Sequence, residues 1–127
     1  MIAVATAPPK LVVFIAVDQL RGDMLARYSA QLQGGYARLM RGAWFVNAFQ
    51  DHGNTETAPG HASMMSGRFP ASTGITSNAT GVVDHRYTLI DALPNEVGAS
   101  PERFQGTTLY DWLAASHPGA RALSVSM

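Results

Sequence analysis

Three segments of the chain have the apolar pattern expected of β-strands. Residues 11–17 are apolar without a break and rich in β-branched side chains. A run of this length is typical of a strand that is covered on both faces of a parallel sheet. Residues 44–49 and 122–126 are predicted as two further strands, and residues 11–17 are expected to be the central one.

Helical patterns alternate with these strands. Residues 18–21 are expected to turn into a helix that continues to about Ser29, and Gly34 and Gly35 interrupt the pattern. Proline is favoured as a first helical residue, so Pro59 predicts the start of a short helix. The predicted helices cover residues 18–29, 36–40, 59–66 and 107–116, with a structured loop at 68–81 and a small hairpin at 82–89. This alternation predicts an α/β domain with a mainly parallel sheet.

Composition restricts the possible functions. Of the 127 residues, 46% are hydrophobic and only 14% are charged, which suits a piece whose faces are covered by more chain. Nine basic residues balance nine acidic ones, so the chain lacks the basic footprint of a nucleic-acid-binding protein. No apolar run reaches the roughly 18 residues of a transmembrane helix. The absence of cysteine excludes disulfides and thiolate metal sites.

The first ten residues differ from the remainder. They lack a charged start and a full apolar stretch, but they contain the pattern Ala-x-Ala twice. Residues 1–10 are therefore predicted to be either a disordered end or the tail of a processed signal peptide. The second alternative implies a periplasmic or secreted protein.

Asp18 directly follows the first predicted strand. Open α/β sheets bind ligands beyond the carboxyl ends of their strands, and a carboxylate there can hold a metal cation. The alternative is that Asp18 only caps the following helix.

Thr57 lies just before the helix predicted to start at Pro59. The free N–H groups of a helix start favour an anion, and a threonine hydroxyl beside them can act as a nucleophile if a base or a metal activates it. Thr55 is a competing hydroxyl, and either threonine can simply belong to a helix start. The local sequence does not separate these alternatives.

Asn78 lies in the polar loop at 68–81. Its amide N–H₂ group is a neutral donor that can grip a phosphoryl oxygen. Asn78 also begins a formal glycosylation sequon, Asn-Ala-Thr, and a plain turn asparagine is a further alternative.

Histidines offer weaker metal candidates. His52 follows Asp51 and His85 follows Asp84, but no second cluster at ligand spacing accompanies either pair. His61 lies on the helix after Pro59, where it is expected to order the turn rather than bind a metal.

Taken together, several of these residues resemble one family. The order and spacing of the matching segments, which run from about Leu11 to Met127, resemble the alkaline phosphatase superfamily. The resemblance is strongest to its type I phosphodiesterase/nucleotide pyrophosphatase branch and, within that, to the threonine-nucleophile alkaline phosphatases. The matching residues are 17–21, 34–39, 57–63, Gly67, Pro70, Gly74, Ile75 and Asn78. The family usually has glycine where this chain has Ala58.

The resemblance implies a role for three residues. Thr57, rather than Thr55, stands at the position of the nucleophile, and Asn78 at that of the phosphate-binding asparagine. Asp18 stands at the position of the first zinc ligand. The implied fold is a three-layer α/β sandwich with a mainly parallel sheet. The implied reaction is hydrolysis of small-molecule phosphate monoesters through a phospho-threonine intermediate at a site with two zinc ions, to which Asp18 and Thr57 would be ligands.

The resemblance also implies parts that this chain does not contain. Further Asp and His ligands, and the Lys-x-Arg pair of the monoesterases, would follow Met127. Residues 11–127 are therefore expected to be the N-terminal portion of a catalytic domain that is inactive alone. Two alternatives stay open: a phosphodiesterase or nucleotide pyrophosphatase of the same family, and a catalytically dead binding remnant. The sequence predicts no oligomeric state.

Overall fold

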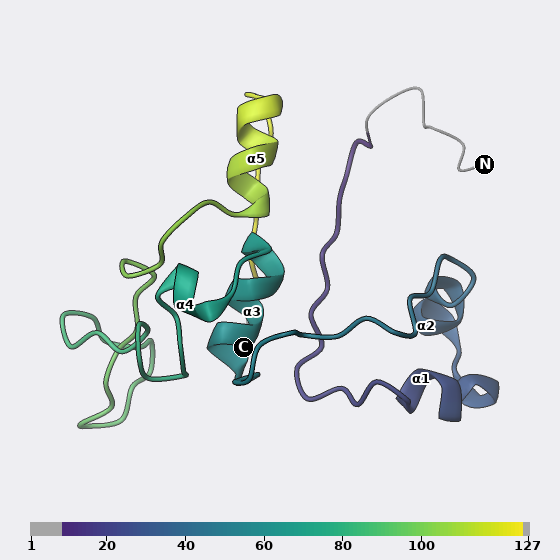
Figure 1. Cartoon of the computed structure of the whole chain (residues 1–127), viewed down its shortest axis with the longest axis horizontal. Coiled ribbons are helices and arrows are strands. Elements are labelled where there is room, and N and C mark those ends of the chain that lie inside the picture. Colours follow the sequence, from purple (N-terminus) through teal and green to yellow (C-terminus); the bar gives the residue numbers. More distant parts are fainter. Residues whose placement is uncertain (1–8, 126–127) are drawn as a thin grey trace. The chain divides into compact units, whose positions relative to one another are not determined.

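A computed structural model describes residues 9–125 and separates the chain into two compact units, Met1–Val46 and Asn47–Met127. Figure 1 shows the helices of both units, and each unit is described by itself. Most of the predicted signal-peptide tail, residues 1–8, lies outside the described residues. Pro9 and Lys10 are exposed and belong to no helix or strand.

The first unit combines a long extended segment with three short helices. The helices are α1 (Met24–Arg27), the 3₁₀ helix η1 (Ser29–Gln31) and α2 (Gly34–Leu39). Asp23 precedes α1 and forms a two-bond ion pair with Arg21, at 2.6 and 2.8 Å. Helix α1 covers only four residues, so the predicted helix at 18–29 is too long. The predicted glycine break is also misplaced, because Gly34 and Gly35 form the first turn of α2.

The three predicted strands are not formed within the described residues. Residues 11–17 run as an extended trace in Figure 1, but Leu11 is 77% exposed and Phe45, in the second predicted strand, is 80% exposed. A strand needs a neighbour to pair its N–H and C=O groups, and residues 9–125 supply none to these segments. The individual strand predictions are wrong for this structure, whereas the α/β fold class stays a prediction.

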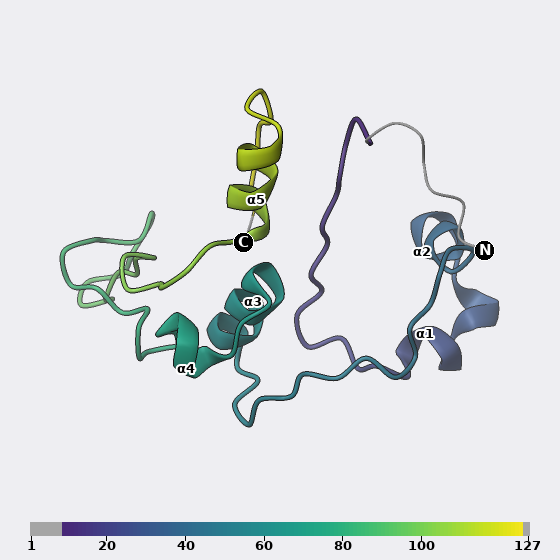
Figure 2. The ribbon, with the colours of Figure 1, turned by 45° about the horizontal axis from the view of Figure 1, so that its top comes forward.

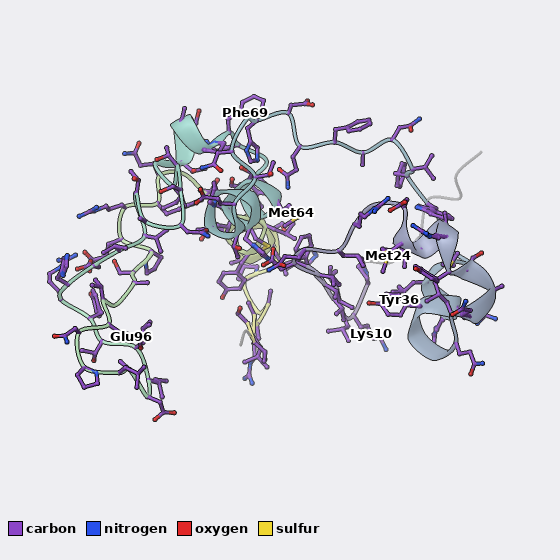
Figure 3. The ribbon with its side chains drawn as sticks, turned by 90° about the horizontal axis from the view of Figure 1, so that it is seen from below. Lys10, Met24, Tyr36, Met64, Phe69 and Glu96 are labelled. Carbon is purple, nitrogen blue, oxygen red and sulfur yellow. The ribbon has the colours of Figure 1, made fainter. Side chains whose placement is uncertain are left out.

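An apolar hollow of about 630 Å³ lies within the first unit. Ile15 and Val17 of the extended segment line it together with Tyr36 of α2, which is labelled in Figure 3, and Trp44. Some apolar side chains of this unit thus line a shared hollow, but none of its described residues is buried.

Helix α3 (Thr57–Ser66) opens the helical part of the second unit. It begins two residues before Pro59, which occupies the third helical position. Proline is tolerated there because the N–H groups of the first turn have no partner within the helix. Gly67, with φ of 64°, ends the helix in the left-handed conformation that glycine adopts without strain.

A small buried cluster supports the end of α3. Helix α4 (Pro70–Thr73) packs against α3, as Figure 2 shows, and Thr73 is completely buried. The Thr73 hydroxyl donates to the Pro70 carbonyl at 3.2 Å and accepts from the Ile75 N–H at 3.3 Å. Its carbonyl accepts from the Gln105 N–H at 2.8 Å, which fixes residues 70–75 to a later part of the chain.

The predicted hairpin at 82–89 is wrong. Val83 pairs instead with Ala99 in an antiparallel bridge, flanked by bonds from Asp84 N–H to Gly98 O at 2.9 Å and from Ser100 N–H to Val82 O at 3.0 Å. The buried Asp84 side chain explains the choice of partner. Its carboxylate accepts from the Ser100 hydroxyl at 2.8 Å, which favours pairing with the more distant segment.

The last helix, α5 (Leu109–Ser116), confirms the prediction at 107–116. Thr108 and Asp111 form a capping box, in which the Asp111 carboxylate accepts from the Thr108 N–H at 2.7 Å. None of the helices in residues 9–125 has the length and apolar character needed to cross a membrane.

Candidate functional site

Thr57 is the first residue of α3 and is exposed, whereas Thr55 precedes the helix by two residues. The first backbone bond of the helix runs from the Gly60 N–H to the Glu56 carbonyl at 2.9 Å. The N–H groups before Gly60 therefore need partners from outside the helix, and the partial positive charge of the helix end lies beside Thr57.

Asn78 supplies one of these partners. Its Oδ1 atom accepts from the Ala58 N–H at 2.8 Å, across 20 residues of sequence. Because the backbone group is a donor, the amide atom that contacts it must be the oxygen. With Oδ1 engaged in this way, Asn78 can grip an anion only through its Nδ2–H₂ group. The structure thus brings Asn78 to the residue that follows Thr57.

Two side chains immediately before the helix hold the loop of Asn78. Glu56 Oε2 accepts from the Asn78 N–H at 2.6 Å, and Asn54 Nδ2 donates to the Thr76 carbonyl at 2.9 Å. Neither residue was predicted from the sequence to belong to the site. The available signal was the placement of two side chains that can accept or donate, two residues apart, directly before a helix start.

The loop is also closed on itself. Ser77 Oγ accepts from the N–H groups of Ala79, at 3.1 Å, and of Thr80, at 2.8 Å, while the Thr76 N–H donates to the Thr80 carbonyl at 3.1 Å. Gly81 follows with φ of +90°, and a Cβ atom there would overlap the Gly74 carbonyl oxygen. These contacts confirm a structured loop around Asn78.

His61 orders the first turns of α3, as predicted. Its Nδ1 atom lies 2.7 Å from the Thr57 carbonyl oxygen. A carbonyl only accepts, so Nδ1 carries the proton in this contact. His61 thus contacts the backbone of Thr57 through Nδ1.

Among the described residues, which include both histidine–aspartate pairs, no group of three His, Cys, Asp or Glu side chains comes together. His52 Nε2 lies 2.8 Å from Gln50 Oε1. Asp84 pairs with Arg86 at 2.6 Å, and Arg86 also pairs with Glu102. Hydrogen bonds from Arg86, and then from Ser100, hold the pKa of the Asp84 carboxyl well below its usual range. Asp84 is thus a structural anion.

Asp18 belongs to the first unit, and Thr57 and Asn78 belong to the second. The structure therefore brings Asn78 to the start of α3 but leaves the position of Asp18 relative to Thr57 undetermined. That these two residues share a metal ion stays a prediction.

Comparison with known proteins assigns the family. The sequence model of the type I phosphodiesterase / nucleotide pyrophosphatase family matches residues 12–124, nearly the whole chain. The chain belongs to this family. The resemblance seen in the sequence is thereby confirmed.

Several curated relatives of the chain are alkaline phosphatases. It is 34% identical to alkaline phosphatase PhoK of Sphingomonas sp, with 98% of this chain and 24% of the relative covered. Identity is 30% to alkaline phosphatase PhoD of Zymomonas mobilis, covering 92% and 22%, and 31% to alkaline phosphatase PafA of Elizabethkingia meningoseptica, covering 97% and 25%. The chain thus spans about a quarter of the length of these relatives. No solved structure matches it.

Proposed function

We propose that this chain forms part of a larger enzyme that hydrolyses small-molecule phosphate monoesters, with Thr57 as the nucleophile. The observation that carries the proposal is the 2.8 Å bond between the Ala58 N–H and Asn78 Oδ1. It brings the Asn78 side chain to the residue that follows Thr57, so that a hydroxyl at a helix start and a neutral amide donor come from neighbouring residues, and an attack on a phosphoryl group can use both.

The reaction would proceed in two steps on this side of the site. Thr57 Oγ attacks phosphorus and gives up its proton to solvent, the bond from phosphorus to the ester oxygen breaks, and that oxygen takes up a proton from solvent and leaves as the alcohol. The Asn78 Nδ2–H₂ group and the positive end of α3 stabilise charge on the equatorial phosphoryl oxygens. Water then cleaves the phospho-threonine, which releases inorganic phosphate and restores the hydroxyl.

Asp18 and Thr57 have the chemistry of zinc ligands, because zinc accepts carboxylate and other oxygen donors. They would supply two of roughly four ligands for one ion of a two-zinc site, and the other ligands would come from parts of the protein outside this chain. When bound, zinc lowers the pKa of a hydroxyl and polarises a phosphoryl group. The chain alone is accordingly expected to be inactive.

The second candidate is phosphodiester or pyrophosphate hydrolysis, which the description of the matching family favours. The names of the relatives favour the monoesterase. By resemblance, a Lys-x-Arg pair beyond Met127 distinguishes the two, since the monoesterases use it to bind the phosphate. A catalytically inactive domain is the third candidate. A periplasmic or secreted location stays a prediction with either activity.

The test replaces Thr57 by alanine in the full-length protein that contains this chain, with Thr55→Ala as the matched control. Thr57→Ala should lower kcat for an aryl phosphate by at least about a thousand-fold and abolish the acid-trapped phospho-enzyme, while zinc content is largely retained. Thr55→Ala should keep both activity and phospho-enzyme. Phospho-enzyme in the Thr57→Ala protein would refute the nucleophile, and a wild-type protein without hydrolytic activity would support the inactive domain.

A further inference from the structure

Glu56 and Asn78 hold each other by two bonds that run in opposite directions. The Glu56 carboxylate accepts from the Asn78 backbone N–H at 2.6 Å, and the Asn78 side chain accepts from the Ala58 backbone N–H at 2.8 Å. The Glu56 side chain therefore binds the backbone of the loop, and the Asn78 side chain binds the backbone of the helix start. Residue 78 cannot shift along the helix start unless both bonds change.

We infer that Glu56 is a positioning residue for the amide of Asn78, an inference that rests on the proposed function. Asn78 is exposed on a loop, so packing does not fix its side chain. The Oδ1 bond alone leaves the Asn78 backbone able to move while the amide pivots about Ala58. The bond from the Asn78 N–H to Glu56 adds a second fixed point, and two points define the direction in which Nδ2–H₂ faces.

The chemistry of the Glu56 bond suits this role. A hydrogen bond to an ionised carboxylate is shorter and stronger than one between neutral groups, in agreement with the 2.6 Å separation. Glu56 is the N-cap residue of α3 but makes no side-chain cap bond to its own helix. Its carboxylate lies near the positive end of the helix, where negative charge is favoured. The carboxylate accepts from the Asn78 N–H of the loop and not from an N–H of its own helix.

Asn54 reinforces the same pair of segments. Its Oδ1 atom accepts from the Glu56 N–H at 3.4 Å, while its Nδ2 group donates to the Thr76 carbonyl at 2.9 Å. The backbone of Glu56 is thus tied to the loop that its own side chain holds.

The experiment compares conservative variants at residue 56 in the full-length protein. Glu56→Gln keeps an acceptor oxygen at the same reach and should retain kcat/KM for an aryl phosphate within about three-fold. Glu56→Asp keeps the charge and a favoured N-cap residue, so the helix should still form, but its carboxylate falls short of residue 78. It should lower kcat/KM about ten- to a hundred-fold and speed hydrogen exchange at the Asn78 amide.

The matched control is Glu96→Ala. Glu96 Oε2 accepts from the Leu93 N–H at 2.9 Å, in a loop that Figure 3 shows well away from α3. This variant removes a comparable bond from carboxylate to backbone and should leave kcat/KM unchanged. If Glu96→Ala and Glu56→Asp lower activity equally, the effect at Glu56 is general destabilisation and the inference is overturned.

A double-mutant cycle separates this inference from the proposed function. Asn78→Ala alone should lower kcat/KM at least about a hundred-fold, and an unchanged value would refute the proposed role of Asn78 itself. In the Asn78→Ala background, Glu56→Asp should have almost no further effect, because the group that it positions is gone. If Asn78→Ala lowers activity but the two losses multiply, Glu56 acts independently of Asn78 and the inference fails while the proposed function stands.

Discussion

Residues 47–125 bury Thr73 and Ile75 and hold their loops by bonds from side chains to backbone, whereas residues 9–46 leave long apolar segments exposed. The two regions differ because turns and loops find hydrogen-bond partners within the unit, whereas an extended strand needs neighbouring strands. The turn at 70–75 and the loop around Ser77 satisfy several of their polar groups within a few residues, and further ones through Asn54, Glu56 and Gln105 of the same unit. An apolar strand is completed only by neighbouring strands. The site at Thr57 lies in the unit that contains the buried turn at 70–75, although Leu123 and Val125 of that unit are exposed.

The largest difference in stability is expected between two glycine-to-alanine substitutions, one in each region, each of which adds a single methyl group. Gly81→Ala puts a Cβ onto the Gly74 carbonyl oxygen at a φ of +90°, so the backbone must move at a cost of about 3 kcal/mol or more. Gly35→Ala, in α2, meets nothing within 4 Å and should be neutral or stabilise by roughly 0.5–1 kcal/mol. Urea unfolding of the 127-residue chain measures both. Equal effects would break the contrast between the regions.

A matched isoleucine pair tests burial in the two regions. Ile75 is 5% exposed and Ile15 is 65% exposed. In the 127-residue chain, Ile75→Ala should cost about 2–4 kcal/mol of unfolding free energy, and Ile15→Ala less than about 0.5 kcal/mol.

The same pair tests the predicted sheet. In the full-length protein the cost of Ile15→Ala should rise toward that of Ile75→Ala, because residues 11–17 are predicted to be a central strand there. A small cost in both proteins would contradict the three-layer α/β fold.

A smaller effect concerns pH. The pKa of Asp84 is lowered from its ordinary value of 3.8, first by Arg86 and then by Ser100. The folded state therefore binds this proton less readily than the unfolded state does. The stabilisation from Asp84 is fully present above its ordinary pKa and is lost as the pH falls below that value. Asp84→Asn should lower the stability at pH 7 and flatten its decline between about pH 5 and pH 2.

The control for this prediction is Asp51→Asn, since Asp51 takes part in none of the ion pairs seen among the described residues. Unfolding of the three proteins at several pH values gives the comparison. A pH profile of Asp84→Asn that runs parallel to the wild type would show that the pairing with Arg86 contributes nothing to acid stability.

Local signals in the sequence predicted much of the second region. Pro59 and Gly67 mark the two ends of α3 closely, and the helical spacing of Leu109, Trp112 and Leu113 predicted α5. The hairpin at 82–89 failed because Asp84 selects Ser100, a partner 16 residues away that no local pattern reveals.

The same reasoning applies to the site. Thr57, Asn78 and Asp18 were selected by resemblance, and the structure brings Asn78 to the start of α3. The role of Glu56 escaped the sequence analysis because its bond to Asn78 spans 22 residues and involves a backbone group, which carries no side-chain signature. The apolar runs predicted strands, but an apolar run does not identify the neighbouring strand with which it pairs.

The central claim is that the start of α3 and Asn78 form the phosphoryl-binding side of an active site. A crystal structure of the full-length protein, grown with zinc and inorganic phosphate, tests it most directly. The account predicts a phosphate oxygen within hydrogen-bond distance of Asn78 Nδ2, with phosphorus facing Thr57 Oγ and Asp18 among the ligands of the nearer zinc ion. Phosphate and zinc bound together elsewhere, with Thr57 and Asn78 facing solvent, would contradict it.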